Sequence, residues 1–270
     1  MSLLLTISDV SRSTYYYHSK RNSIPDKYSN IKEAISHIYH ENYGRYGYRR
    51  ITIALRNLGY HINHKTVQRL MKELCLICRV RAKKYKAYNE QLSRIAPNLL
   101  NRDFKATAPN QKWSTDITEF KMFGKRLYLS VIIDLYSQDI VSYTISEHQL
   151  LSMVIDTLYD AFKLLPEGVK PLLHSDQGWQ YWHKQYRQAL TENGIQQSMS
   201  RRGNCLDNAV IENFFGHLKS ELLYLQKFDS LEQFKIKLVE YLDYYNNHRI
   251  KVKLKGLPPA IHRQQALELI

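Results

Sequence analysis

Trp113-Ser-Thr-Asp-Ile-Thr-Glu-Phe120 alternates apolar and polar side chains, which is the pattern of a β-strand with a buried face. Two further strand patterns follow, over residues 126–135 and 138–146, with Gly124 and Ser137 in the turns between them. After these, helical and strand patterns alternate. We expect a helix at 149–164, a strand at 170–174, a helix at 182–193, a strand at 195–199 and a helix at 207–225. This order predicts an α/β fold in which helices cover a mixed sheet.

Three carboxylates of this region form a candidate site. Asp116 lies in the first strand, Asp176 follows the apolar run Pro171-Leu-Leu-His174, and Glu212 lies near the start of the helix predicted at 207–225. Two strand-borne aspartates and a helix-borne glutamate can converge on a pair of divalent cations. Such a site stabilises both the attacking and the leaving oxygen of a phosphodiester displacement. Because residues 106–270 contain 18 Asp and Glu, spacing alone does not single out these three.

The first part of the chain has the pattern of a small helical domain. Apolar residues at helical spacing predict three helices between residues 28 and 75, and Gly59 is placed to end the second. Asn63 is placed to cap the third helix, whose polar face is opposite its buried stripe. That face consists of Lys65, Gln68, Arg69 and Lys72. Two helices joined by a short glycine-containing turn, the second with a basic and amide face, predict a DNA-binding helix-turn-helix.

Positive charge is concentrated before the predicted sheet. Residues 1–105 contain 20 Lys and Arg against 7 Asp and Glu, whereas residues 106–270 contain 19 against 18. This asymmetry favours nucleic acid as a partner, although a merely solubilising basic surface would give the same numbers. The segment 79–88 combines five cations with two tyrosines, which suits phosphates and stacked bases. The cations expected to contact DNA there are Arg79, Arg81, Lys83, Lys84 and Lys86.

The residues that flank Asp176 and Glu212 are more specific than their spacing. They read His174-Ser-Asp-Gln-Gly-Trp-Gln-Tyr181, Ser198-Met-Ser-Arg-Arg-Gly-Asn-Cys-Leu-Asp-Asn-Ala209 and Glu212-Asn-Phe-Phe-Gly-His-Leu-Lys-Ser-Glu221. With 35 residues between Asp176 and Glu212, this pattern resembles the DDE catalytic core shared by retroviral integrases and bacterial transposases. It is most similar to the second-frame (OrfB) transposase subunit of two-frame insertion sequences. The resemblance extends from about Ile7 to Ala266.

The resemblance implies a ribonuclease H-like core in a transposase that cleaves insertion-sequence ends and joins the freed 3′-hydroxyl to target DNA. It implies that Asp116, Asp176 and Glu212 are the catalytic metal ligands of two Mg²⁺ ions, for which Mn²⁺ could substitute. The implied partners are transposon-end and target DNA, the product of the upstream reading frame (OrfA) or a fusion with it, and further copies of the chain on DNA. A ribonuclease H-like nuclease without strand joining and a DNA-binding regulator with an inactive core remain alternatives.

Other polar residues near the triad have predicted roles. Those expected to contact DNA are Arg201, Arg202, Asn208 and Lys219. Asn208 and Lys219 are placed there because a continuous helix would bring them to one face with Glu212. Asp207 is interpreted as the N-cap of that helix. Asp134 is the rival ligand, at the end of the second strand, but the DDE motif does not use it. His174 is interpreted as a strand residue beside the site.

The chain divides into five predicted segments. They are a partial helix-turn-helix remnant at 1–27, a helix-turn-helix-like DNA-binding domain at 28–78, a basic linker at 79–105, an integrase-like catalytic core at 106–228 and a C-terminal helix with a basic tail at 229–270. Ser230-Leu-Glu-Gln233 is predicted to cap the last helix, and Pro258-Pro259 to end the tail. No apolar run approaches the ~18 residues of a membrane span, so we expect a cytoplasmic, nucleoid-associated protein.

Overall fold

The computed structural model describes residues 11–22, 26–80, 96–201 and 205–268. The chain forms two compact units, Met1–Cys78 and Arg79–Ile270. Helix α2 (Arg12–Asn22) is the described part of the predicted N-terminal remnant. Several predicted DNA contacts lie outside the described residues, namely Arg81, Lys83, Lys84, Lys86 and Arg202.

Three helices of the smaller unit confirm the predicted pattern. They are α3 (Ser29–Glu41), α4 (Tyr48–Asn57) and α5 (His64–Glu73). Gly59 follows the end of α4 with a φ of 88°, a conformation that costs glycine little. The Asn63 side chain caps α5 by accepting a hydrogen bond from the Lys65 amide at 2.9 Å. The apolar stripes meet in a core that contains Ile35, Ile38, Ile51, Leu55, Val67, Leu70 and Met71.

The larger unit is built on a five-stranded mixed sheet with the order β3-β2-β1-β4-β5. The strands are β1 (Lys112–Met122), β2 (Lys125–Asp134), β3 (Ile140–Ser146), β4 (Leu172–Ser175) and β5 (Gln196–Met199). The first three form an antiparallel meander, whereas β4 runs parallel to β1 and β5 parallel to β4. This is the ribonuclease H-like order that the sequence predicts.

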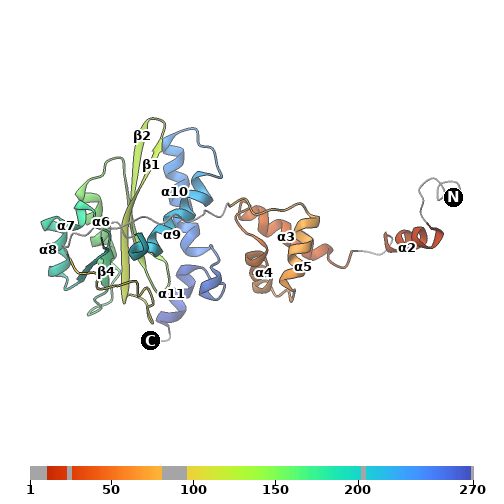
Figure 1. The fold of residues 1–270 in the computed structure, drawn as a ribbon, viewed down its shortest axis with the longest axis horizontal. Helices are drawn as coiled ribbons and strands as arrows, with labels where there is room; N and C mark the ends of the chain where they lie inside the picture. The colour runs from red at the N-terminus through yellow and green to blue at the C-terminus, as the bar shows by residue number, and fades with distance from the viewer. Residues whose placement is uncertain (1–10, 23–25, 81–95, 202–204, 269–270) are drawn as a thin grey trace. The chain divides into compact units, whose positions relative to one another are not determined.

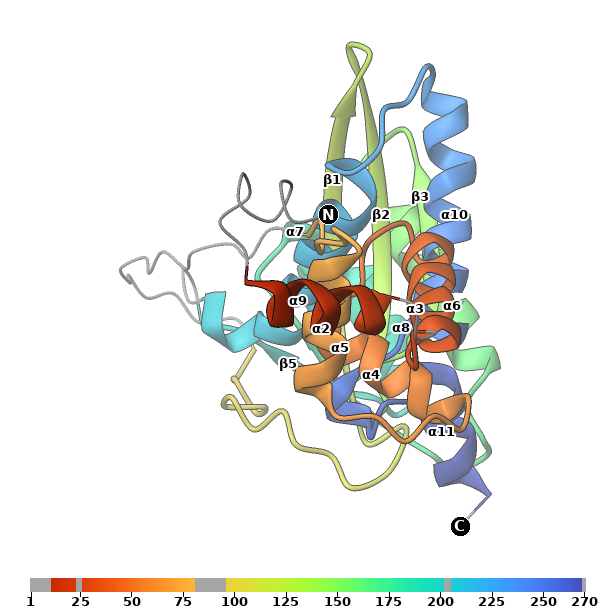
Figure 2. The same cartoon turned by 90° about the vertical axis from the view of Figure 1, so that its right-hand side faces the viewer.

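Helices cover both faces of this sheet (Figures 1 and 2). One face packs against α6 (Leu151–Lys163), α7 (Trp179–Trp182) and α8 (Lys184–Glu192), around a core that includes Trp113 and Leu173. The other face packs against α9 (Ala209–Leu218) and α10 (Leu231–Asn247), with Phe120 in that core. Trp113 and Phe120 fall on opposite faces because side chains alternate along β1.

The C-terminal segment belongs to the same compact unit as the sheet. The Phe234 ring of α10 lies 5.1 Å from the Phe120 ring of β1, so the boundary predicted at residue 228 does not mark a break in packing. As predicted, Ser230 caps α10 by accepting from the Gln233 amide at 3.1 Å. The prediction for Pro258-Pro259 was wrong. A short 3₁₀ turn, η3 (Val252–Leu254), leads into α11 (Pro259–Leu267), and Pro259 begins this helix because its fixed φ suits a first turn.

Two predicted helices differ in extent or winding. The helix expected at 182–193 is α8, and the extended backbone of His183 separates it from the short α7, which the sequence did not predict. The helix expected at 207–225 consists of a 3₁₀ turn η1 (Cys205–Asn208), then α9, then a π turn η2 (Lys219–Leu223). These changes of winding alter which side chains share a face.

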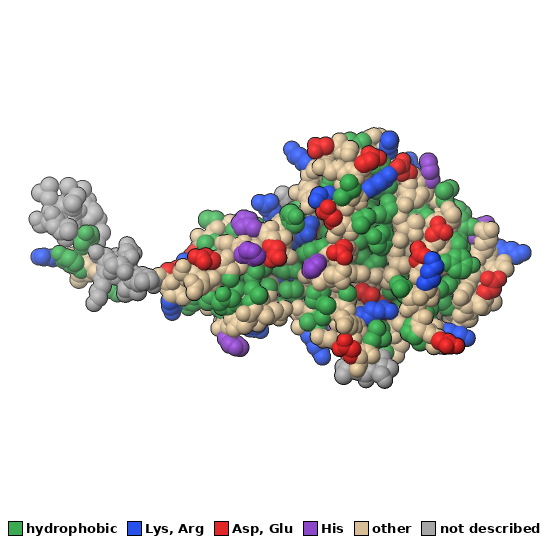
Figure 3. All heavy atoms as spheres, turned by 180° about the vertical axis from the view of Figure 1, so that it is seen from behind, with side chains coloured by type: hydrophobic (Ala, Val, Ile, Leu, Met, Phe, Trp, Pro, Cys, Tyr) green, Lys and Arg blue, Asp and Glu red, His purple; other side chains and the backbone are tan. Residues whose placement is uncertain are grey.

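The surface of the larger unit agrees with the near balance of charge in residues 106–270. On the face seen in Figure 3, basic and acidic side chains are mixed over this unit. Within the described part of the chain, none of the helices has both the length and the apolar character that crossing a membrane requires.

Candidate active site

The sheet register brings Asp116 and Asp176 to neighbouring positions. Strands β1 and β4 run parallel, and Thr115 pairs with Ser175 at the last step of their register. Asp116 and Asp176 are the residues that come next after this pair along the two segments. Adjacent strands lie about 4.8 Å apart. Both side chains are half-buried. Two carboxylates far apart in the sequence therefore meet at the carboxyl end of β4.

A tight turn follows Asp176. Its Oδ1 atom accepts a hydrogen bond from the Gly178 amide at 2.8 Å. A Cβ atom at Gly178 would lie 3.0 Å from that oxygen and 2.9 Å from the Gln180 Oε1 atom, so a larger residue there would displace the Asp176 carboxylate or the Gln180 amide. Tyr181 of α7 is buried. Burial is the largest cause that raises its pKa, and the charges of Asp116 and Asp176 are the next. The sequence analysis missed Tyr181, whose only signal was its place in the quoted motif.

Glu212 lies in the first turn of α9, where its side chain is exposed. The helix is held against the sheet by the apolar residues Ile211, Phe214 and Leu218. Just before α9, the Asn208 Oδ1 atom accepts a hydrogen bond from the Ser114 hydroxyl at 2.7 Å. Because Ser114 stands two residues before Asp116 on β1, this bond ties the start of the glutamate helix to the strand of the first aspartate.

The three carboxylates share an electrostatic environment. Burial, followed by repulsion from Asp176 and with a smaller contribution from Glu212, raises the pKa of Asp116 to about 8. Burial also raises the pKa of Asp176. Although the Glu212 side chain is exposed at the surface, partial desolvation of its carboxylate and then the charge of Asp176 raise its pKa. Lys219 opposes this effect at Asp116, and its ammonium lies 5.8 Å from the Phe120 ring centroid. The site therefore has more negative charge than its own side chains neutralise.

This environment predicts a pH-dependent cost to stability. Between the ordinary Asp value of 3.8 and about 8, the folded protein holds a proton on Asp116 that the unfolded chain has lost. Stability therefore falls as pH rises through this window. We expect Asp116→Asn to raise the melting temperature relative to the native chain in metal-free buffer. The increase should be at least ~3 °C larger at pH 8 than at pH 5. Calorimetry checks this, and the same increment at both pH values would contradict it.

The three carboxylates are suitable ligands for a divalent cation, although their side chains do not yet converge on one point. Among the described residues, no three His, Cys, Asp or Glu side chains surround a common point at metal-binding distance. The Asp116 Oδ1 atom instead accepts from the Ile117 amide at 2.7 Å. Three anions repel one another when they converge without a cation. Their oxygens are nevertheless the ligands that Mg²⁺ prefers, and its charge would relieve the repulsion that raises their pKa values.

Two other candidates have structural roles. Asp134 is buried, and its carboxylate accepts hydrogen bonds from the Asn110 amide at 2.6 Å and the Tyr136 amide at 2.8 Å. The bond to Tyr136 fixes the turn after β2, the bond to Asn110 ties that turn to the segment before β1, and Asp134 is not among the charges that shift the pKa values of the three carboxylates. His174 is fully buried on β4, and burial lowers its pKa to about 4. It is therefore neutral at physiological pH.

Two predictions at the start of α9 were wrong. Asn208 is only 3% exposed, so it cannot contact DNA from the surface. It was placed on the Glu212 face by assuming a continuous α-helix, whereas the 3₁₀ turn η1 gives it another direction. Asp207 does not cap α9, because its carboxylate binds Arg102 and Arg201 instead. The Arg201 guanidinium, predicted to contact DNA, is thus engaged within the protein.

The polar face of α5 is exposed, as its periodicity predicts, at Lys65, Gln68, Arg69 and Lys72. Arg69 forms an ion pair with Glu73 on the same helix and lies over the Tyr28 ring, 5.4 Å from its centroid. Arg79, which follows the smaller unit in sequence, is also exposed.

The sheet order and the domain matches together define an integrase-core protein. The family model described as "Integrase core domain" matches residues 106–205, a second model of the same description matches 212–267, and an "HTH-like domain" matches 27–84. The catalytic core domain of HTLV-2 integrase, solved with magnesium, superposes with a TM-score of 0.48 and 21% identity over 59% of this chain and 99% of that one.

Relatives from bacteria narrow the class. The InsK protein of insertion sequence element IS150 from Escherichia coli K12 is 53% identical over 97% of this chain and 93% of its own length. The transposase of insertion sequence element IS904 from Lactococcus lactis is 37% identical over 82% of this chain and 88% of its own length. The chain belongs to the insertion-sequence transposases. It is therefore a polynucleotidyl transferase of DNA transposition and integration.

Proposed function

We propose that this transposase works through a DDE site formed by Asp116, Asp176 and Glu212, which cleaves the insertion-sequence end and joins its freed 3′-hydroxyl to target DNA. The proposal is supported above all by the parallel register of β1 and β4, which makes two aspartates neighbours on adjacent strands. It is supported further by the effect of Asp176 on the pKa values of both other carboxylates.

The proposed reaction consists of the hydrolysis of one phosphodiester bond followed by a transesterification. In the first, a water oxygen bonds to phosphorus at the element's end, and the bond from phosphorus to the 3′-oxygen breaks, so that this oxygen leaves as a hydroxyl. In the second, that hydroxyl attacks a target phosphodiester, and the target's own 3′-oxygen departs with the proton. Each joining event conserves the number of phosphodiester bonds. The reaction therefore requires neither a nucleotide cofactor nor a covalent protein intermediate.

The three carboxylates would hold two Mg²⁺ ions, for which Mn²⁺ could substitute. When bound there, such ions would activate the attacking oxygen and stabilise the leaving one. The chain's own contribution is to fix the three ligands on two strands and one helix and to partly exclude water from Asp116. Lys219, whose positive charge acts on Asp116, is suited to bind a DNA phosphate beside the ligands.

An end-joining assay tests this function. Labelled duplexes that stop at the element's last nucleotide, with either a 3′-hydroxyl or a 3′-deoxy end, and a longer duplex that retains flanking DNA to report cleavage, are each incubated with the full chain, Mg²⁺ and a target plasmid. Of the two shorter duplexes, we expect label to join the plasmid only from the one with a 3′-hydroxyl and only with a divalent cation. Cleavage without joining would identify a nuclease, and binding without either reaction would identify a DNA-binding regulator.

We propose that residues 28–78 and the cations of 79–88 bind the element's ends. The further proposed partners are target DNA, other copies of the chain and the upstream-frame product, either separate or fused. Adding that product to the end-joining assay tests the last point, since stimulation of joining would indicate that the two act together. No change in joining would remove the upstream product from the proposal.

Recognition of the end sequence is expected to depend on Gln68. If α5 enters the major groove, the Gln68 amide is suited to an adenine edge, and Gln68→Ala should reduce the preference for end DNA over random DNA by roughly 1–3 kcal/mol. Arg69→Ala should have a similar or smaller effect, because its guanidinium is already paired with Glu73.

Lys83→Ala provides a matched control for Gln68→Ala. A phosphate contact should weaken binding to all sequences alike and reduce the salt dependence. Competition binding at several salt concentrations measures both quantities. If the Gln68 variant kept full preference for end DNA and the Lys83 variant lost it, the roles of base contact and phosphate contact would have to be exchanged.

A further inference from the structure

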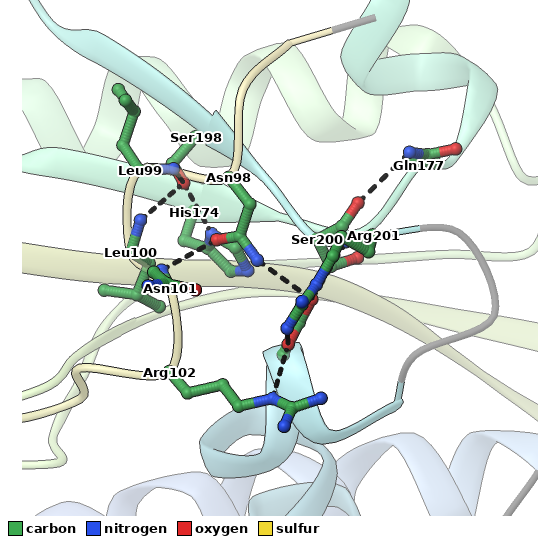
Figure 4. Close-up of polar contacts among 11 residues, drawn as sticks. Asn98, Leu99, Leu100, Asn101, Arg102, His174, Gln177, Ser198, Ser200 and Arg201 are labelled. Atoms are coloured by element: carbon green, nitrogen blue, oxygen red, sulfur yellow. Dashed lines mark hydrogen bonds and ion pairs between the residues drawn. The ribbon is translucent and has the colours of Figure 1, made fainter. Parts of the chain in front are cut away.

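The Asp207 carboxylate is a buried hub for five hydrogen bonds, centred on the loop before the glutamate helix. Its Oδ2 atom accepts from Asn98 Nδ2 at 2.8 Å, from the Arg201 amide at 3.0 Å and from Arg201 Nε at 2.9 Å. Its Oδ1 atom accepts from Arg102 Nε at 2.9 Å and Arg201 Nη2 at 3.0 Å. Its partners Asn98, Arg102 and Arg201, labelled in Figure 4, come from two separate stretches of chain.

Two of these partners come from the segment that precedes the sheet. Residues 96–105, called here the linker strap, are the described end of the predicted basic linker. Asn98 also bonds within the strap, where its Oδ1 atom accepts from the Asn101 amide at 2.8 Å. Asn101 and Arg102 both have positive φ, a conformation that asparagine tolerates but that is costly for arginine. Such a backbone persists when surrounding contacts hold it, so the strap is fixed by what it binds.

The strap is also bonded to the strands beside Asp176. The Ser198 hydroxyl of β5 accepts from the Leu99 amide at 3.0 Å and the Leu100 amide at 3.1 Å. The same oxygen lies 2.9 Å from His174 Nδ1 on β4. Since Ser198 already accepts two amide protons, its own proton is directed to the His174 ring, which agrees with a neutral histidine. The strap thus rests on β5, whose Ser198 contacts His174 of β4, the strand that Asp176 follows (Figure 4).

The beginning of α9 is therefore held from two sides. Asn208 binds Ser114 on β1, and Asp207, its neighbour, binds the strap and Arg201. Burial alone would raise the pKa of Asp207. Hydrogen bonds from Arg201 and then Arg102 instead lower this pKa to about 2, so the carboxylate stays ionised at physiological pH. Glu212 follows in the first turn of the helix, where the direction of the helix start sets the position of its carboxylate.

We propose that Asp207 is a positioning residue for the glutamate helix, and that Asn98 and Arg102 of the linker strap act through it. The strap is then part of the active site rather than a passive connection between the DNA-binding region and the catalytic sheet. This inference rests on the proposed role of Glu212. It assigns to Asp207, Asn98 and Arg102 no contact with DNA or metal.

Variants of the strap separate positioning from general stability. Asn98→Ala and Arg102→Ala remove partners of Asp207. Lys112→Ala is the matched control, because its amine holds the same strap through the Asp103 carboxylate at 2.8 Å and the Lys105 carbonyl at 2.9 Å but does not touch Asp207. Arg102→Lys restores the positive charge. Each full-length variant is examined by hydrogen exchange at residues 209–213, by end-DNA binding and by the Mg²⁺ dependence of cleavage.

We expect Asn98→Ala and Arg102→Ala to speed amide exchange at 209–213 by about fivefold or more. We also expect both to raise the Mg²⁺ concentration for half-maximal cleavage by about tenfold, while end-DNA binding is kept. Lys112→Ala should change neither quantity, and Arg102→Lys should recover part of the loss. Exchange and Mg²⁺ dependence equal to those of Lys112→Ala would overturn the proposal. Glu212→Gln is measured in parallel, and normal cleavage by that variant would overturn the proposed function instead.

Discussion

Replacing Asp116 or Asp176 by Asn, or Glu212 by Gln, is expected to reduce strand cleavage and joining by at least the order of 10³-fold. Each substitution keeps the shape of the side chain but removes a charge that a divalent cation requires. Because none of the three lies in the smaller unit, binding to end DNA should persist in all of them. Single-turnover cleavage of a labelled end duplex measures the first effect, and a gel shift measures the second.

Asp134→Asn is the control for this series. Asp134 is a buried aspartate at the end of β2, and its carboxylate accepts from the main-chain amides of Tyr136 and Ser137 in the following turn and from the Asn110 amide. We expect its variant to lower stability and to keep measurable activity at low temperature. Near-normal cleavage by an amide variant of Asp116, Asp176 or Glu212 would remove that residue from the proposed site.

A second large effect is expected from the ion pair behind the glutamate helix. Glu221 of η2 and Arg249, which follows α10, are each 1% exposed, and Arg249 donates to Glu221 at 2.6 and 2.8 Å. Tyr241 of α10 donates to the same carboxylate at 3.0 Å. Arg249→Met would remove the Arg249 guanidinium from the buried Glu221 carboxylate. We expect it to cost about 3–5 kcal/mol of unfolding free energy.

Denaturant unfolding followed by tryptophan fluorescence measures this loss. All three tryptophans, Trp113, Trp179 and Trp182, lie in the larger unit, so the signal reports that unit alone. Lys237→Ala is the control, since its pair with Glu240 is at the surface and should contribute less than about 1 kcal/mol. The double variant Glu221→Leu, Arg249→Met should recover much of the loss, because it leaves no unpaired charge. A cost below ~1 kcal/mol for Arg249→Met would contradict this view of the pair.

The sequence predicts the elements of this fold well where local physics decides them. β1 is evident from alternation, and α5 from its stripe, its Asn63 cap and the glycine turn before it. The order of the strands is equally accessible, because three strands joined by short turns pair as a meander. The proximity of Asp116 and Asp176 is not local, since it depends on the parallel register of β1 and β4. The grouping of these two aspartates was predicted from the resemblance to a known catalytic core, because periodicity does not indicate it.

Some errors come from contacts distant along the chain, and others come from local geometry that the sequence does not mark. Asp207 has the composition of a helix cap, but Arg102, 105 positions away, and Arg201 provide stronger partners. Asn208 was assigned to an exposed face because a change from 3₁₀ to α winding leaves no mark in the sequence. Pro259 was interpreted as a terminator, although proline is equally compatible with the first turn of a helix. The linker strap, whose composition indicates only a basic connection, is positioned by Ser198 and Asp207.

Binding of divalent cations to the triad can be measured without turnover. Mn²⁺ is titrated into the full chain bound to end DNA, and the bound fraction is followed by electron paramagnetic resonance for the native protein and for Asp116→Asn, Asp176→Asn and Glu212→Gln. If the three carboxylates are the ligands, the native complex binds Mn²⁺ that each amide variant loses or binds far more weakly, while Asp134→Asn binds as the native chain does. Equal Mn²⁺ binding by the native complex and the three amide variants would contradict a DDE site at these residues.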